Sequence, residues 1–372
     1  MLNRLPSFAR SLAALVTLVA FQALPASGTQ TWQIARAPYR FAFPRDHFAH
    51  DNYRTEWWYF TGHLRAVDGR RYGFELTFFR FGLRPHPYRV KPGRSAWHGA
   101  QLYSAHLAIT DIDGKHFYYA ERSARDALGM GFASRRRLLV RVNGWSLRGT
   151  SAIEPTMELR AANGGNAIDL RVVPEKMPVV EGPGGISRKG PCASCASHYY
   201  SFTRLRASGT LRVGGRTERV GGIAWMDHEY GSDELSVGQV GWDWFSIQLH
   251  DGRELMLYRL RERDGATTPQ SSGTLVSRSG RPTYLPLRDF HITPTGYWRS
   301  PHTHVRYPSG WVVRVAGIAA PLRLIPVLKD QELVGRQATY WEGAVRVVDA
   351  STGRRLGQGY VELTGYAGAI SL

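Results

Sequence analysis

The feature that most constrains this fold is the alternation of apolar and polar residues along short segments that end in turns. Residues 72–81, 254–260, 311–318 and 344–350 alternate in this way and are rich in β-branched and aromatic side chains, which is typical of half-buried β-strands. Turns containing glycine close many of these segments, at Asp68-Gly69, Asp113-Gly114, Asn143-Gly144, Gly214-Gly215, Asp251-Gly252 and Thr352-Gly353. We therefore expect an all-β fold of antiparallel barrels or sandwiches. Helical turns are expected only near residues 123–127 and 325–333.

One internal repeat predicts how these strands are divided. Residues 56–64 (EWWYFTGHL) continue through an Asp-Gly-Arg turn into an apolar strand that ends at Arg80, and residues 241–249 (GWDWFSIQL) continue through a second such turn into a strand that ends at Arg259. A repeat of this kind indicates duplicated barrels. We therefore expect an N-terminal domain over residues 40–235 and a C-terminal domain over residues 238–372, joined near residues 231–241.

The first 28 residues have the pattern of a secretory signal peptide. Arg4 and Arg10 precede the apolar run of residues 11–24, and small residues follow it through Gly28. This order of a basic, an apolar and a small-residue region is typical of a cleaved leader, and the run is shorter than the roughly 20 residues that span a bilayer. We expect the mature protein to be periplasmic or secreted.

Charge and cysteine content suggest partners for an exported protein. The formal net charge is +18 at pH 7, which favours attraction to an anionic membrane surface. The arginines are spread along the chain, so we do not expect nucleic acid as a partner. Export permits a disulfide between Cys192 and Cys195, while free thiols or a functional pair are the alternatives.

Four reactive side chains stand at consecutive positions, Asp227, His228, Glu229 and Tyr230. On a strand, alternate residues face opposite sides. The functional interpretation makes His228 or a carboxylic acid the proton donor, with a pKa tuned by burial against aromatic residues. The alternative is a domain junction in which the acids accept hydrogen bonds and His228 is a core residue. Because the repeat places this cluster between two barrels, we expect a pocket at the seam.

Aromatic residues near this cluster suggest a wall for an apolar ligand. Trp57 and Trp58 could instead lie on opposite faces of one strand, one filling the barrel and the other covering it. An isolated His-x-Glu is too short to predict a zinc site, and no nucleotide-binding loop or nucleophile elbow is present, so we expect neither a metal nor another cofactor. The expected substrate-binding residues are Trp57, Trp58, Glu56, His50, Trp242, Asp243 and Trp244.

Several segments, in order, resemble the AttH/CrtC-like superfamily: FPRDHFAHDNYRTEWWYFTGHL, SHYYSFTRL, WMDHEYGS and GWDWFSIQLHDGRELMLYRLR. This superfamily includes bacterial carotenoid 1,2-hydratase, exported proteins labelled predicted secreted hydrolases and, more distantly, fungal lipocalin-like pericyclases. The resemblance implies two consecutive lipocalin-like barrels of about eight to ten strands each. It also implies a cavity between or within them and an isoprenoid- or lipid-like ligand.

The same resemblance implies the catalytic residues. In the carotenoid hydratases, an Asp-His-x-Trp-Gly motif and a downstream Tyr-x-Asp motif carry the acid-assisted addition of water to a carbon–carbon double bond, without a cofactor. This chain matches the first motif at Asp227 and His228 but has Tyr230 in place of Trp, and it has Tyr258 followed by Leu260 where the second motif has its acid. The implied catalytic set is His228, Asp227, Glu229, Tyr230 and Tyr258, and Glu229 or Asp243 is a candidate for the missing carboxylate.

Two functions from different classes follow from the sequence. The first is an exported hydratase- or hydrolase-type enzyme that acts on an apolar ligand by acid–base chemistry at the seam. The second is a non-catalytic periplasmic carrier in which the same aromatic residues bind a lipid. Attachment to an anionic surface through the net charge is a third hypothesis, and it predicts binding that weakens with salt.

Overall fold

The computed structural model describes residues 31–85, 99–232 and 235–368, so the expected leader lies outside the described residues. The all-β prediction is confirmed. The described part of the chain contains 25 strands and three short 3-10 helices, η1 (Arg45–His47), η2 (Pro183–Gly185) and η3 (Leu287–Asp289). The helical turns expected near residues 123–127 and 325–333 are wrong, because strands end or begin there. Among the described residues, no helix is both long and apolar enough to cross a membrane.

The first sheet is antiparallel, and its strands follow the order β4-β3-β2-β1-β13-β12-β9-β8-β7-β6-β5. The terminal strands β4 and β5 also contact each other, which nearly closes the barrel. The short strands β10 and β11 pair with β12. In chain order the strands are β1 (Thr55–Ala66), β2 (Arg71–Gly82), β3 (Gln101–Asp111), β4 (His116–Arg125), β5 (Gly131–Ala133), β6 (Leu139–Val142), β7 (Trp145–Gly149), β8 (Met157–Asn163), β9 (Asn166–Pro174), β10 (Val179–Val180), β11 (Ser187–Arg188), β12 (Ala196–Val213) and β13 (Arg216–Gly231).

The second sheet is also antiparallel, in the order β17-β16-β15-β14-β25-β24-β22-β21-β18, with β23 paired to β24. The helix η3 contacts both terminal strands, β17 and β18. The strands are β14 (Gln239–Leu249), β15 (Glu254–Glu262), β16 (Ser272–Val276), β17 (Pro282–Pro286), β18 (Phe290–Pro294), β21 (Trp311–Val315), β22 (Leu322–Pro326), β23 (Glu332–Val334), β24 (Thr339–Asp349) and β25 (Arg355–Leu363). A separate hairpin pairs β19 (Tyr297–Arg299) with β20 (Arg306–Pro308).

The two sheets repeat one topology, as the duplicated segments predicted. In each, the first strand lies between the second strand and the last: β1 pairs with β2 and β13, and β14 pairs with β15 and β25. The first sheet has 13 strands rather than the eight to ten that the resemblance implies. The excess comes from strands of two or three residues, of which β10 and β11 pair with the long strand β12.

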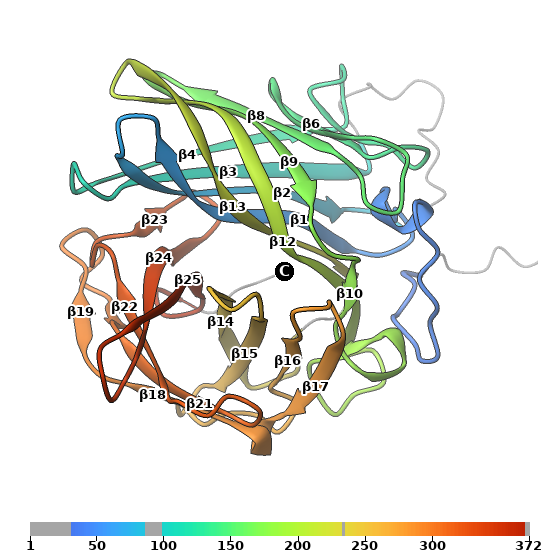
Figure 1. Ribbon diagram of the computed structural model, residues 1–372. Coiled ribbons are helices and arrows are strands. Elements are labelled where there is room, and N and C mark those ends of the chain that lie inside the picture. Colours follow the sequence, from blue (N-terminus) through green and yellow to red (C-terminus); the bar gives the residue numbers. More distant parts are fainter. Residues whose placement is uncertain (1–30, 86–98, 233–234, 369–372) are drawn as a thin grey trace, which may run out of the picture. The chain divides into compact units, whose positions relative to one another are not determined.

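The three largest apolar clusters of the described residues form the core of the fold. One fills the first barrel, around Trp58, Phe60 and Phe78, and another fills the second barrel, around Phe245 and Trp311. A third lies between the barrels and contains Tyr59, Tyr199, Trp225, Trp244, Met256, Tyr258, Leu260, Ala344 and Tyr360. Figure 1 shows the two sheets against each other, and β1 contacts β25 while β12 contacts β14 and β15. This interface is the seam on which the candidate site is built.

The two cysteines are joined. Cys192 and Cys195 form a disulfide with their Cα atoms 5.1 Å apart, in the loop between β11 and β12. The bridge closes the loop that leads from Lys189, a residue of the seam pocket, into β12.

Candidate functional site

Strand alternation divides the four reactive residues of β13 between two places. Asp227 and Glu229 face the seam between the barrels, where they line a cavity. His228 and Tyr230 face the opposite way and contact residues of the first barrel, as when His228 stacks on Trp58 at 4.7 Å between ring centroids. The four neighbours in sequence therefore belong to two separate clusters, because successive side chains of a strand point to opposite sides.

The cavity at the seam, called the seam pocket below, has a volume of about 70 Å³. Its walls are mostly aromatic, and its polar groups include three carboxyls, one amine and three phenol hydroxyls. Strands of both barrels contribute. The lining residues are Trp57, Tyr59, Phe79, Lys189, Tyr199, Asp227, Glu229, Leu235, Trp242, Trp244, Tyr258, Leu260 and Glu362.

Most of the pocket is built from equivalent positions of the two repeats. Trp57 and Tyr59 on β1 correspond to Trp242 and Trp244 on β14 in the repeated segments. The strand register extends the correspondence: Trp57 lies opposite Phe79 and Trp242 lies opposite Leu260. The seam pocket is therefore nearly symmetric about the line between the barrels. The pairing of the first and second strands also makes Arg80 equivalent to Arg261. The match of Arg80 with Arg259 expected from the sequence repeat is therefore wrong by two residues.

Two carboxyls occupy equivalent places in this symmetric arrangement. Asp227 lies opposite Tyr59 across the β1–β13 pair, and Glu362 lies opposite Trp244 across the β14–β25 pair. Each also accepts a hydrogen bond from an indole: the Trp225 Nε1–H donates to Asp227 Oδ1 at 2.6 Å, and the Trp242 Nε1–H donates to Glu362 Oε2 at 2.7 Å. Each barrel thus contributes to the pocket one acid that accepts an indole hydrogen bond.

Burial controls the protonation of both acids. Burial raises the pKa of Asp227 to about 7, although hydrogen bonds from Ser201, Tyr199 and Trp225 oppose the shift. The pKa of Glu362 is raised to about 7, again by burial and against the hydrogen bond from Trp242. Near neutral pH, each carboxyl therefore exchanges a proton readily, which is the property required of a general acid or base.

A lysine balances the third carboxyl of the pocket. Lys189 Nζ lies 2.9 Å from Glu229 Oε1, and the ammonium also lies 4.2 Å from the centroid of the Tyr258 ring. The Tyr258 hydroxyl accepts a hydrogen bond from Ser272 Oγ at 2.8 Å. Glu229 is therefore the one carboxyl of the pocket that pairs with a cation among the described residues.

A larger groove adjoins the seam pocket. Phe79, Trp242 and Glu362 line both cavities, so these three side chains form the wall between them. The groove has a volume of about 580 Å³, and its other walls include Phe81 and Leu102 from the first barrel and residues 335–340 before and at the start of β24. We call it the outer groove. Its size is in the range of pockets that hold small organic molecules.

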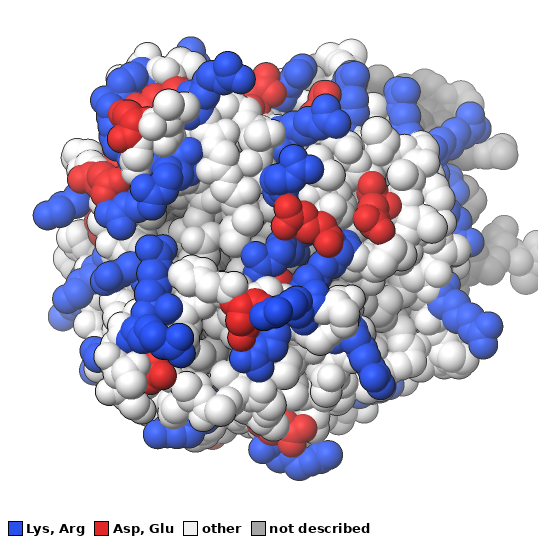
Figure 2. Space-filling view, viewed as in Figure 1, with Lys and Arg blue, Asp and Glu red and all other residues white. Residues whose placement is uncertain are grey.

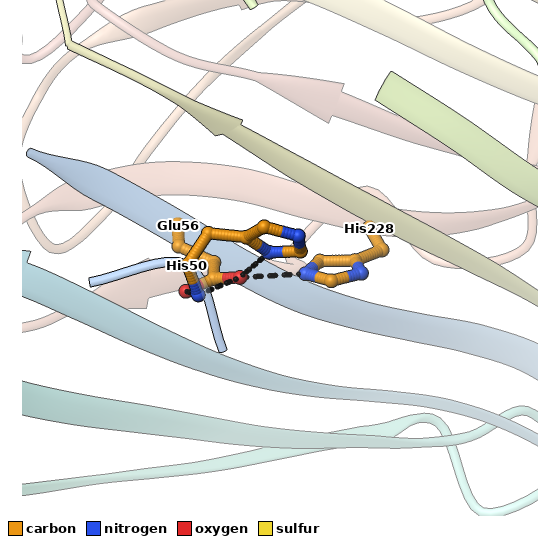
Figure 3. A group of neighbouring side chains, drawn as sticks. All are labelled: His50, Glu56 and His228. Carbon is orange, nitrogen blue, oxygen red and sulfur yellow. Dashed lines mark hydrogen bonds and ion pairs between the residues drawn. The ribbon is translucent and has the colours of Figure 1, made fainter. Parts of the chain in front are cut away.

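The inward-facing histidine belongs to a hydrogen-bonded cluster in the first barrel. His228 Nε2 and His50 Nδ1 lie 2.9 and 2.8 Å from the same oxygen of Glu56, and Figure 3 shows both rings directed at that oxygen. The Arg80 Nε–H donates to the other Glu56 oxygen at 2.8 Å. Burial alone would raise the pKa of Glu56, but the charge of Arg80 and the hydrogen bonds from both histidines outweigh it and lower that pKa.

This cluster has the residue types of a metal site. The ligand atoms of His50, Glu56 and His228 lie within 4.8 Å of one another. Each nevertheless has a hydrogen-bond partner within the cluster, and the buried Arg80 guanidinium already supplies a positive charge. Even without an ion, these side chains form a hydrogen-bonded ion-pair network. It connects His50 to the strands β1, β2 and β13.

The structure therefore brings six of the twelve predicted site residues into one pocket. Six others lie elsewhere: Glu56, His50, Trp58, His228 and Tyr230 are in the first barrel, and Asp243 faces the second. Trp58 is fully buried in the first barrel's core. Tyr230 stacks on His50 at 3.6 Å between ring centroids. Asp243 accepts hydrogen bonds from Arg259 at 3.1 Å and Arg261 at 2.8 Å. The pocket residues are Asp227, Glu229, Tyr258, Trp57, Trp242 and Trp244.

Sequence reasoning missed Tyr199, Lys189 and Glu362. The Tyr199 hydroxyl donates to Asp227 at 2.6 Å and accepts a hydrogen bond from the Trp244 indole at 3.1 Å. Tyr199 lies in the SHYYSF segment that contributed to the family resemblance, which is a signal for it. Glu362 lies on β25, the last strand of the second barrel, and it comes near Asp227 only because the two barrels pack together. No local sequence pattern therefore identifies it.

The fold and the site together define a double-barrel, lipocalin-like class of protein. A family model described as AttH-like matches residues 34–366, so the chain belongs to the AttH-like family. A structure of a protein assigned as AttH from Nitrosomonas europaea is similar, with a TM-score of 0.80, 31% identity, and coverage of 90% of this chain and 99% of that one.

Two further structures share the fold at low identity. Kievitone hydratase from Nectria haematococca has a TM-score of 0.66 and 14% identity, covering 91% of this chain and 96% of its own. CghA with Sch210972 has a TM-score of 0.52 and 14% identity, covering 92% and 98%. A comparison with curated protein sequences finds no match to this chain.

Proposed function

We propose that this protein is a cofactor-independent, hydratase-type enzyme that acts on a carbon–carbon double bond of an isoprenoid- or lipid-like substrate in the seam pocket. One observation carries the proposal: Asp227, with a pKa raised to about 7 by burial, faces a pocket with aromatic walls. A carboxylic acid that is still partly protonated near neutral pH is suited to protonating a substrate. One protein of the same fold is named a hydratase, which is consistent with this chemistry. At 14% identity, that likeness supports the fold and not the proposed reaction.

The proposed reaction uses the two equivalent acids in turn. The Asp227 carboxyl donates its proton to one carbon of the double bond, and the electron pair of the π bond forms the new C–H bond. The neighbouring carbon becomes a cation, which the faces of Trp57 and Trp244 stabilise by up to about 2 kcal/mol each when desolvated. A water oxygen then bonds to the cation while the Glu362 carboxylate accepts a proton of that water. The product is an alcohol.

Resetting the site costs little in this scheme. After one turnover Asp227 is ionised and Glu362 is protonated, which reverses their starting states. Since both have a pKa of about 7, moving the proton back through solvent is close to thermoneutral. Tyr199, which donates to Asp227, and the Lys189–Glu229 pair hold the remaining charges of the pocket in place.

The test measures addition of water directly. The protein is incubated with a panel of terpenoid alkenes in H2(18)O, and products that gain the mass of one labelled water are detected by mass spectrometry. We expect Asp227→Asn and Glu362→Gln to abolish labelled product while Asp169→Asn, an exposed strand position, retains it. Labelled product that persists in the Asp227 and Glu362 variants contradicts the proposal.

The carrier function has one observation in its favour, which is the larger volume of the outer groove compared with the seam pocket. A carrier predicts an apolar ligand that copurifies with the protein and is lost to organic extraction, with no turnover in any variant. Both functions fit an exported protein whose net charge draws it to an anionic membrane surface, and we propose this location on the basis of the leader pattern and the charge.

A further inference from the structure

A second cavity lies further along the seam and has the opposite chemical character. It has a volume of about 240 Å³ and is lined by His63 and Arg65 at the end of β1, whereas Trp57 and Tyr59 of the same strand line the seam pocket. Four arginines line it, and none of its lining residues in the described part of the chain is an aspartate or a glutamate. The charged and titratable lining residues are Arg65, Arg71, Arg346, Arg355, His63 and His250. We call this cavity the arginine pocket.

Each barrel contributes two of the four arginines. Arg65 and Arg71 lie directly opposite each other across the β1–β2 pair, an arrangement in which like charges repel. Arg346 lies on β24 and Arg355 begins β25. Two strand pairs from different barrels therefore direct their basic ends to the same cavity, which concentrates positive charge unless an anion binds there.

Little of this charge is neutralised within the protein. Asp113 pairs with Arg71, while Arg65 donates to the Gly69 carbonyl at 3.0 Å. Within residues 31–85, 99–232 and 235–368, Arg65, Arg346 and Arg355 make no ion pair. Burial lowers the pKa of His250, and the charges of Arg355 and Arg204 lower it further. Figure 2 shows a face on which basic side chains outnumber acidic ones.

We propose that the arginine pocket binds a phosphate group, as a phosphate monoester or a diphosphate. A guanidinium presents paired N–H donors that match phosphate oxygens, and several guanidiniums around one cavity favour a multiply charged anion over a single carboxylate. The proposal is independent of the chemistry in the seam pocket. The phosphate group belongs either to a free small molecule or to the headgroup of a lipid, since both present the same oxygens.

The test uses sodium diphosphate and inorganic phosphate as soluble probes. Binding is measured by calorimetry and by the shift in melting temperature, in the wild type, in Arg346→Gln/Arg355→Gln and in a matched control, Arg314→Gln/Arg323→Gln. The four substituted arginines are all exposed. Each double variant removes two positive charges from the second barrel, so the two variants have the same net charge. Circular dichroism checks that each variant is folded.

We expect diphosphate to bind the wild type and the control equally, and to bind the pocket variant at least about tenfold more weakly, since losing hydrogen bonds to a charged group costs about this much or more. Binding to the wild type should weaken with salt. No measurable binding of diphosphate or phosphate overturns the proposal, as does equal loss in the pocket variant and the control, which would show only nonspecific charge.

Vesicles distinguish the two sources of phosphate. Phosphatidylcholine vesicles with and without phosphatidic acid, which carries a phosphate monoester, are added to the three proteins. Retention of the wild type and control on phosphatidic acid vesicles, with loss of the pocket variant, identifies a lipid headgroup as the ligand. Binding of soluble diphosphate without vesicle binding identifies a free phosphate compound, and either result supports the pocket.

Discussion

Asp227 and Glu362 occupy equivalent positions in the two barrels, although they are 135 positions apart in the chain. Each lies opposite an aromatic residue on the neighbouring first strand, each accepts an indole hydrogen bond, and each has a pKa raised to about 7 by burial. The repeated barrel topology therefore gives the pocket two similar acids, which are the two that the proposed addition of water uses.

The rate of the proposed reaction should have a maximum close to pH 7. The active form needs Asp227 protonated and Glu362 ionised. Since both have a pKa of about 7, activity should fall below pH 6, where Glu362 takes up a proton, and above pH 8, where Asp227 has lost one. The measurement is kcat/KM against pH with the alkene identified by the labelling experiment. A profile that is flat from pH 5 to 9 contradicts the assignment of the two acids.

Stability should reveal the protonation of Asp227 independently of any activity. Its pKa is raised from 3.8 to about 7 in the folded protein, so between pH 4 and 7 the folded state keeps a proton that the unfolded state has released. Folding is therefore favoured by Asp227 at the lower pH, and this contribution is lost as the pH rises through 7. Asparagine does not ionise, so the stability of Asp227→Asn should rise relative to that of the wild type as the pH increases over this range.

The size of this gain follows from the shift. At about 1.4 kcal/mol per pH unit, the free energy of unfolding of Asp227→Asn should rise relative to the wild type by up to about 4 kcal/mol between pH 4 and 7, and then stay level. Urea denaturation at several pH values measures it. Asp169→Asn, at an exposed position, should show no such trend. A constant difference between Asp227→Asn and the wild type would mean that Asp227 is ionised throughout.

The sequence predicts the fold of this protein better than it predicts the site. Alternation and turn dipeptides identify strands because these signals are local, and the repeat of residues 56–64 at 241–249 identifies the duplication. The site depends on which side of each strand a residue faces and on how the barrels pack. Adjacency in sequence groups His228 with Asp227, whereas the strand places them on opposite sides. The second acid of the proposed reaction is Glu362, and it lies near Asp227 only because the two barrels pack together at the seam.

The Glu56–Arg80 pair should be essential to the first barrel. Both side chains are completely buried, and Arg80 Nε lies 2.8 Å from Glu56 Oε2. Arg80→Met leaves the Glu56 charge without its cation and should lower the free energy of unfolding by about 3–5 kcal/mol. Glu56→Gln/Arg80→Met removes both charges and should recover much of that loss. Urea denaturation of the three proteins is the measurement. A single variant as stable as the wild type would show that the two histidines alone neutralise Glu56.

If the proposed reaction takes place in the seam pocket, the outer groove should determine how long a substrate the protein accepts. Ala338 is partly buried in the wall of the groove, so Ala338→Trp places an indole in that space without altering the seam pocket. We expect kcat/KM for a C20 terpenoid alkene to fall by about tenfold or more, since the lost apolar burial exceeds 1.4 kcal/mol, while a C5 alkene, which is too short to extend into the groove, should be affected much less. Val334→Trp is the control, because Val334 is exposed on β23 and lies outside the groove. An equal effect of Ala338→Trp on both alkenes would mean that the groove does not hold the rest of the substrate.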